Sequence, residues 1–235
     1  MNRNHLWSVI IVVLLSAVFA FSACAEELSF AERVDALKTT VLTSQENLRQ
    51  YEWIETSVVS VKGEEKSRKQ ERCYYGSDGK LQKVLVTKNA PEASKPGIRG
   101  MIAKNKKAEM TDYMKEAVNL VRSYVPLDPG KIEAVKAAGK VTFQLTEPGR
   151  RARMVFIDYQ KTGDNLAIDL DLVNNSPFAM SVQSFLKSPK EPVTLNVSIS
   201  ALNDGTIYVS NAVLNAKEKN LKVTIENSGY RRMLQ

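Results

Sequence analysis

Residues 192–201 read PVTLNVSISA, and this stretch decides the fold. Apolar and polar residues alternate along it without a break, and the apolar set is Val193, Leu195, Val197, Ile199 and Ala201. Because successive side chains of a β-strand point to opposite faces, the stretch predicts a strand with one apolar and one polar face. Such strands belong to antiparallel sheets, in which one side covers a core or a ligand and the other meets water.

Nine further runs with strand character surround this one. Three of them come early, at 51–62, 66–75 and 80–87, and the others lie at 140–147, 150–160, 165–173, 177–186, 206–216 and 221–227. Short turn signals such as Gly76-Ser77-Asp78-Gly79 separate neighbouring runs. Strands about ten residues apart that are joined by short turns predict an antiparallel meander.

Helical spacing marks three segments, at 29–50, 101–124 and 131–138. Ser29 and Glu32 have the spacing of a capping box, and Asp128-Pro129 is a cap followed by a first-turn proline. Three strands before the last two helices and seven after them favour an α+β fold. We expect one large antiparallel sheet with helices on its apolar face.

The first 25 residues have the pattern of a secretory signal peptide, which leaves 26–235 as a single domain. A positive Arg3 precedes an apolar stretch at 8–21 that is shorter than a membrane span. Two cleavage sites remain open. Ala23-Cys24-Ala25 predicts cleavage before Glu26 and a soluble periplasmic protein, whereas residues 21–24 resemble a lipobox that would leave an acylated Cys24 and an outer-membrane lipoprotein.

Composition argues against an enzyme. The only histidine, His5, lies in the predicted signal peptide, so the mature chain lacks Ser-His-Asp and Cys-His pairs and the commonest metal ligand. Without Cys24, Cys73 has no partner for an internal disulfide, and we expect it to be a small, partly buried strand residue. Asp158, Asp169 and Asp171 are expected on the wet face as solvated charges. We predict no catalytic residues, no metal and no cofactor.

The formal net charge is +7, and the excess of Lys and Arg lies mainly between residues 62 and 115. A basic surface favours anionic partners. Because the chain is exported and lacks an aromatic–basic binding motif, we expect no nucleic acid. The loop at 88–99, from Lys88 to Arg99, is instead a candidate contact with an anionic membrane surface.

The order of elements resembles the periplasmic lipoprotein carrier and receptor superfamily of the Lol system. The local match covers residues 48–86, where a helix passes directly into Tyr51-Glu52-Trp53-Ile54-Glu55-Thr56 and a hairpin meander, and the closing run at 221–232 also fits. The resemblance implies a sheet curled into an unclosed half-barrel, with helices as a lid over its concave apolar face. It further implies a cavity for lipoprotein acyl chains. The superfamily carrier's buried arginine could correspond to Arg68, Arg72 or Arg153.

We therefore expect a monomeric periplasmic protein that holds a lipid or lipoprotein acyl chain. The candidates for lining its cavity are Trp53, Phe143, Leu145, Ile168, Leu170, Met180, Val182, Leu195 and Val197, and the candidates for its lid are Met101, Met110 and Met114. Flexible methionine side chains suit an adaptable apolar surface. Ordinary core packing is the alternative for each residue. The alternative function is a non-catalytic envelope protein of the same fold with a filled core, anchored through Cys24.

Overall fold

The computed structural model describes residues 30–89, 98–125 and 127–233. The predicted signal peptide, Cys24 and most of the loop at 88–99 lie outside these residues. The described residues up to Ala36 and those from Leu37 onward belong to two separate units. Apart from the helical conformation of residues 30–36, the following description concerns the second unit.

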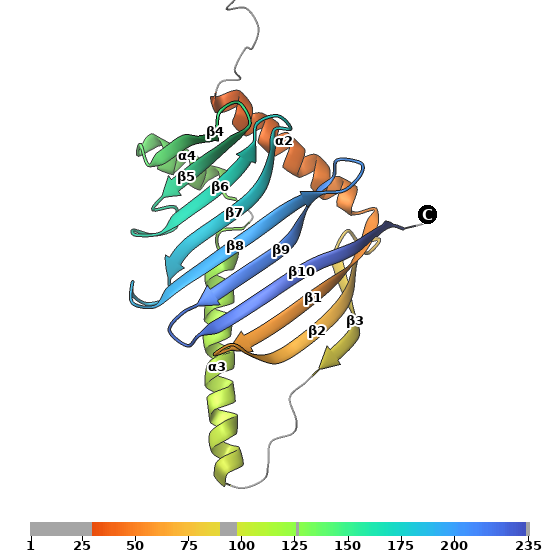
Figure 1. Cartoon of the computed structure of the whole chain (residues 1–235), viewed down its shortest axis with the longest axis vertical. Helices are drawn as coiled ribbons and strands as arrows, with labels where there is room; N and C mark the ends of the chain where they lie inside the picture. The colour runs from red at the N-terminus through yellow and green to blue at the C-terminus, as the bar shows by residue number, and fades with distance from the viewer. Residues whose placement is uncertain (1–29, 90–97, 126, 234–235) are drawn as a thin grey trace, which may run out of the picture. The chain divides into compact units, whose positions relative to one another are not determined.

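Ten strands form one antiparallel sheet in the order β3-β2-β1-β10-β9-β8-β7-β6-β5-β4 (Figure 1). Their bounds are β1 Tyr51–Val61, β2 Glu64–Tyr75, β3 Leu81–Asn89, β4 Val141–Glu147, β5 Arg151–Ile157, β6 Asn165–Asp171, β7 Ser176–Phe185, β8 Pro192–Ala201, β9 Ile207–Ala216 and β10 Leu221–Arg232. Strands β3 and β4 are the two edges, so the sheet is open and half-barrel-like. The predicted α+β class with an unclosed sheet is confirmed.

The helices described are α2 Phe30–Leu48, α3 Ile98–Arg122 and α4 Pro129–Ala137. Helix α4 begins where the sequence predicts, because Asp128 Oδ1 accepts the backbone N–H groups of Gly130 at 2.8 Å and Lys131 at 3.3 Å. Within the described residues, no helix is both long and apolar enough to cross a membrane.

The hairpin turns explain how the strand register is set. Between β1 and β2, Lys62 and Gly63 both have positive φ, at 55° and 82°, as the tight type I′ turn requires. Glycine adopts such angles without steric cost, which fixes the turn to these two residues. The strands on either side then pair from Val61 opposite Glu64 onward.

The pairing of β1 with β10 joins the two strand groups. Strands β1 to β3 form one meander and β4 to β10 form another, and β10 runs antiparallel to β1 along the full length of β1. The sequence predicts that this last strand ends at residue 227, but it continues to Arg232, which lies opposite Tyr51. The extension past the predicted end exists because β1 offers backbone partners there.

Candidate functional site

One face of the sheet carries two apolar rows that run across the strands. Residues directly opposite each other in antiparallel strands share a face, so the register assigns both rows. The first row is Phe156, Leu166, Val182, Leu195, Leu214, Val223 and Val59. The second is Phe143, Met154, Ile168, Met180, Val197, Ala212 and Ile225. We call this face the inner face and the opposite one the outer face.

Burial changes along the first row. Leu166 and Val182 are fully buried, and Leu195 and Leu214 are nearly so. Val223 on β10 and Val59 on β1 are only half-buried. The inner face therefore contains a packed region under β5 to β9 and continues as accessible apolar surface on β10 and β1.

The end of α3 is fixed to the inner face by a buried hydrogen-bond network. Ser184 shares this face, since it lies opposite Val193, and its hydroxyl oxygen is 2.9 Å from the hydroxyl of Tyr124, which follows α3. The Tyr124 hydroxyl donates to the carboxylate of Asp164, and both residues are fully buried. Burial, with a further contribution from Asp164, raises the pKa of Tyr124, so its hydroxyl remains a donor.

The middle of α3 contacts the turn between β9 and β10. Lys219 Nζ lies 2.5 Å from Glu109 Oε1 and 5.1 Å from the centroid of the Tyr113 ring. The lid candidates Met110 and Met114 are half-buried on the same helix, and Met101 lies in its first turn. Helix α3 thus reaches from the β9–β10 turn to the Tyr124 network on β7.

Three rows of the sheet bring together most of the predicted cavity-lining residues. Phe143, Ile168, Met180 and Val197 share one row, Val182 and Leu195 share a second, and Leu145 and Leu170 share a third through Ala152. Six of the nine candidates are buried, namely Trp53, Ile168, Leu170, Val182, Leu195 and Val197. Met180 is half-buried.

Phe143 and Leu145 differ from the other candidates, with exposed fractions of 39% and 55%. Both lie on the edge strand β4, where no further strand of the sheet follows on the outside. Their place in the inner-face rows is as expected, but at this edge they are open to solvent.

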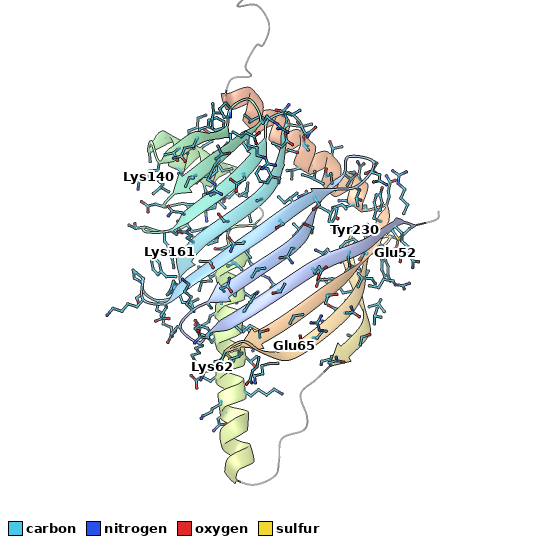
Figure 2. The ribbon with its side chains drawn as sticks, viewed as in Figure 1. Glu52, Lys62, Glu65, Lys140, Lys161 and Tyr230 are labelled. Atoms are coloured by element: carbon cyan, nitrogen blue, oxygen red, sulfur yellow. The ribbon has the colours of Figure 1, made fainter. Side chains whose placement is uncertain are left out.

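Trp53 belongs to a separate aromatic cluster formed by Tyr51, Trp53, Tyr75, Tyr208 and Tyr230, from strands β1, β2, β9 and β10. The rings of Trp53 and Tyr230 stack at a centroid distance of 5.3 Å, and Tyr208 lies 4.3 Å from Tyr230. Tyr230 lies near Glu52 at one end of the sheet (Figure 2). Burial raises the pKa of Tyr230. Sequence analysis missed the cluster because its rings come from strands that are far apart in the chain.

Two ion pairs lie beside the aromatic cluster on the inner face. Glu55 and Glu71 are directly opposite each other in β1 and β2. Lys83 Nζ lies 2.6 Å and 2.7 Å from the two carboxylate oxygens of Glu55, and Lys69 Nζ lies 2.7 Å from Glu71 Oε1. These pairs neutralise two shielded carboxylates on neighbouring strands. Beyond Val59 and Ile225, the two apolar rows lead to Ser67 and to Ser57 with Lys69. Together with the two ion pairs, these polar residues form a polar border toward β2 and β3.

The three arginine candidates all lie on the outer face. Arg68 is opposite Val58, Arg72 is opposite Ile54 and Arg153 is opposite Asp169. Nearly half of each side chain is exposed, and each is ion-paired. None of them is a buried arginine of the kind that the superfamily resemblance implies.

The predicted wet-face carboxylates do not form a joint site. Asp169 is buried, contrary to the expectation of a solvated charge, because Arg153 binds both of its oxygens at 2.7 Å and 2.9 Å. Asp158 pairs with Lys140, and Asp171 accepts backbone N–H groups in the next turn. Among residues 30–89, 98–125 and 127–233, no group of His, Cys, Asp or Glu is arranged to hold a metal ion.

An open pocket of about 540 Å³ lies between the end of α2 and the end of β10. Its lining residues are Glu46, Arg49, Gln50, Arg232 and Met233. Four of these side chains are polar or charged, so the pocket does not suit an acyl chain. It does not include any of the predicted cavity residues.

No family model and no curated protein matches this sequence. Similar solved structures include a LolA superfamily protein from Nitrosomonas europaea, with 8% identity and a TM-score of 0.35 over 84% of this chain and 94% of that chain. A DUF1329 family protein from Desulfovibrio piger has the same identity and TM-score, over 85% and 94% of the two chains. A putative outer membrane lipoprotein-sorting protein domain from Vibrio parahaemolyticus also has these values, over 83% and 92%.

The first of these structures is described as a LolA superfamily protein and the third as a lipoprotein-sorting domain. The resemblance noted from the sequence is to the same superfamily. At 8% identity and a TM-score of 0.35, they support no argument about ligand or activity. The functional reasoning below therefore depends on the inner face itself.

Proposed function

We propose that the protein is exported to the periplasm and binds an acyl chain of a lipid or a lipoprotein on the inner face. One observation carries the proposal. The first apolar row does not end where the packed region ends, but continues through half-buried Val223 and Val59. Accessible apolar surface in continuity with a core is typical of ligand-binding grooves.

The physical chemistry of this surface fits a long apolar ligand. Burial of each CH₂ group contributes about 0.8 kcal/mol, so one acyl chain could supply on the order of 10 kcal/mol before the costs of association. Such binding needs no catalytic motif and no specific polar partner. The polar border formed by Glu55, Glu71 and their lysines would limit how far the chain extends toward β3.

A second candidate function is favoured by a different observation. Six of the nine predicted cavity residues are already buried, which is also what a filled core requires. In this case the protein would be a non-catalytic interaction protein of the envelope, with Cys24 as its anchor if the lipobox is used. The two functions differ in whether a ligand occupies the inner face.

Native mass spectrometry of the protein purified from the periplasm, with lipid extraction of the same sample, tests the proposal. We expect a lipid-sized adduct that a fluorescent fatty acid displaces. The starting residue seen in the same spectrum distinguishes cleavage before Glu26 from acylation of Cys24. An apo mass together with no uptake of the fluorescent fatty acid would favour the second function.

Two neighbouring substitutions on β10 provide a matched comparison. Val223→Glu places a carboxylate on the inner face, whereas Thr224→Glu places one on the outer face of the same strand. Because an unpaired charge is costly against an apolar ligand, we expect Val223→Glu to weaken fatty-acid binding by about tenfold or more. Thr224→Glu should leave binding unchanged, and thermal melting of both variants monitors the fold. Equal binding by the two variants would contradict the assignment of the inner face.

A further inference from the structure

One end of the sheet carries a group of exposed lysines. Because the strands alternate in direction, the β1–β2, β7–β8 and β9–β10 turns all lie at this end. Backbone hydrogen bonds connect neighbouring segments, since the N–H of Lys62 donates to the Asn220 carbonyl at 2.9 Å and that of Lys217 to the Pro192 carbonyl at 3.1 Å. The three turns therefore form one continuous surface, on which Lys62 is labelled in Figure 2.

Helix α3 adds two lysines to this surface. The ion pair between Glu109 and Lys219 fixes the helix beside the β9–β10 turn, and residues 105–109 are all exposed. From Glu109 toward its N-terminus, the helix continues past the end of the sheet (Figure 1). Lys106 and Lys107 precede Glu109 by less than one helical turn, so they lie at the same end of the sheet as the three turns.

We call residues 62–63, 105–109, 186–191 and 217–220 the lysine-rich end. They contain seven lysines and three glutamates. Glu109 is already paired with Lys219, which leaves a surplus of positive charge on the other lysines. Six of these lysines are exposed, and within the part of the chain that the structure describes none of them is ion-paired; they are Lys62, Lys106, Lys107, Lys187, Lys190 and Lys217.

The opposite end of the sheet differs in how its charges are balanced. Arg49, Lys80 and Arg150 lie there, and each forms an ion pair with a carboxylate two or three residues away. Positive charge at that end is thus neutralised locally. The surplus at the lysine-rich end is a property of one surface and not only of a basic chain, and such a surface attracts an anionic partner.

The residue type and the spacing indicate what kind of anionic partner fits. All six unpaired side chains are lysines, whose flexible ammonium groups act as point charges, whereas arginine supplies the fixed fork that matches one carboxylate or phosphate. The turns extend over five neighbouring strands, from β1 to β7, which is about 20 Å. Lysines spread in this way suit negative charges distributed over a broad surface, as in a layer of anionic phospholipid head groups.

We propose that the lysine-rich end docks the protein on a membrane surface that contains anionic phospholipids. Each lysine close to such a surface strengthens binding by about fivefold, and salt screens the attraction, so the contact is reversible. This surface is distinct from the loop at 88–99 that the sequence suggested. The proposal does not depend on whether the inner face binds an acyl chain.

Co-sedimentation with phospholipid vesicles tests the docking. The mature protein beginning at Glu26 is used, so that no acyl anchor contributes. We expect it to bind phosphatidylcholine vesicles that contain phosphatidylglycerol, to release them as the NaCl concentration rises, and to bind pure phosphatidylcholine vesicles at least about tenfold more weakly. Equal binding to both kinds of vesicle overturns the proposal. Salt-sensitive binding to polyglutamate without binding to the anionic vesicles also overturns it, in favour of an acidic protein partner.

Two double variants with the same change of charge test the location. Lys190→Gln/Lys217→Gln removes two charges from the lysine-rich end, and we expect it to weaken binding to the anionic vesicles by at least about tenfold. Lys80→Gln/Arg150→Gln removes two charges from the opposite end and should change binding by less than about threefold. Thermal melting of both variants monitors the fold. An equal loss in the two variants would show that only net charge matters and would overturn the assignment of the surface.

A fluorescent label tests the orientation on the membrane. Lys187→Cys and Lys80→Cys each introduce one exposed thiol, whereas the native Cys73 is buried. With an environment-sensitive fluorophore on the new thiol, we expect the emission at position 187 to shift to the blue when anionic vesicles are added, and the emission at position 80 to stay unchanged. A shift of equal size at both positions, or a shift at position 80 alone, overturns the proposed orientation.

Discussion

Removal of the Tyr124 hydroxyl is the most informative single change in the buried network. In Tyr124→Phe the ring stays, but the carboxylate of Asp164 loses its side-chain donor. Among the donors of the described residues, Asp164 then keeps only the backbone N–H groups of Gln160 and Lys161, at 3.0–3.3 Å. Because Asp164 is fully buried, water does not replace the lost donor.

The expected loss of stability follows from this geometry. A hydrogen bond to a charged group contributes about 1.5–3 kcal/mol, and for a domain of this size each kcal/mol shifts Tm by about 2–4 °C. We therefore expect Tm to fall by about 3–12 °C. Differential scanning calorimetry at neutral pH measures the change, with Tyr74→Phe as a control because half-buried Tyr74 lies on the outer face.

A double-mutant cycle refines this prediction. Neutral hydrogen bonds are about half as strong as charge-assisted ones, so Tyr124→Phe should cost about half as much in an Asp164→Asn background. A Tm change below about 1 °C for Tyr124→Phe, or the same cost in both backgrounds, would refute the reasoning that a buried charged acceptor holds the end of α3.

Three further predictions concern the region around the aromatic cluster. The pKa of Asp204 is lowered to about 2, mainly because the Tyr51 hydroxyl donates a hydrogen bond to its carboxylate. The stabilising effect of this carboxylate is therefore complete above about pH 5 and is lost as the pH falls toward 2. Over that range, the difference in thermal stability between wild type and Asp204→Asn should shrink. Burial raises the pKa of Cys73 to about 11, so a thiol reagent at pH 8 should label it only after unfolding, and rapid labelling of the native protein would contradict its burial. Trp53→Phe removes the 3.1 Å hydrogen bond from the indole N–H to Asn227. The free energy of unfolding, measured by urea denaturation, should fall by about 0.5–1.5 kcal/mol or more. An unchanged urea midpoint would show that the bond does not contribute to stability.

Local sequence patterns were sufficient to predict where the strands lie and which side chains share a face of the sheet. Alternation at 192–201 predicts β8 with its apolar residues on the inner face, and Asp128-Pro129 marks the start of α4. Both features depend on residues that are close together in the chain, because strand alternation and helix capping act between near neighbours. Ile168 and Val197, both predicted to lie on the apolar face, share a row of the sheet through Met180.

Features that depend on distant pairing could not be predicted in the same way. The continuation of β10 to Arg232 requires β1 as a partner, and nothing in residues 228–232 alone indicates it. Asp169 has the alternation of a solvated residue, yet Arg153 on the neighbouring strand binds and shields it. The exposure of Leu145 similarly results from the place of β4 at the edge of the sheet, which the strand's own sequence does not specify.

The junction between β1 and β10 has a consequence for the order of folding. Tyr51 of β1 pairs with Arg232 of β10, so β1 can form its second strand pairing only when almost all of the chain is available. Contacts between residues so far apart in sequence slow folding, because the entropy of closing the intervening chain is lost before the contact forms. Until β10 is available for pairing, the β1 side of the meander formed by β1 to β3 stays unpaired. A chaperone that binds extended apolar segments would have its longest opportunity in that interval.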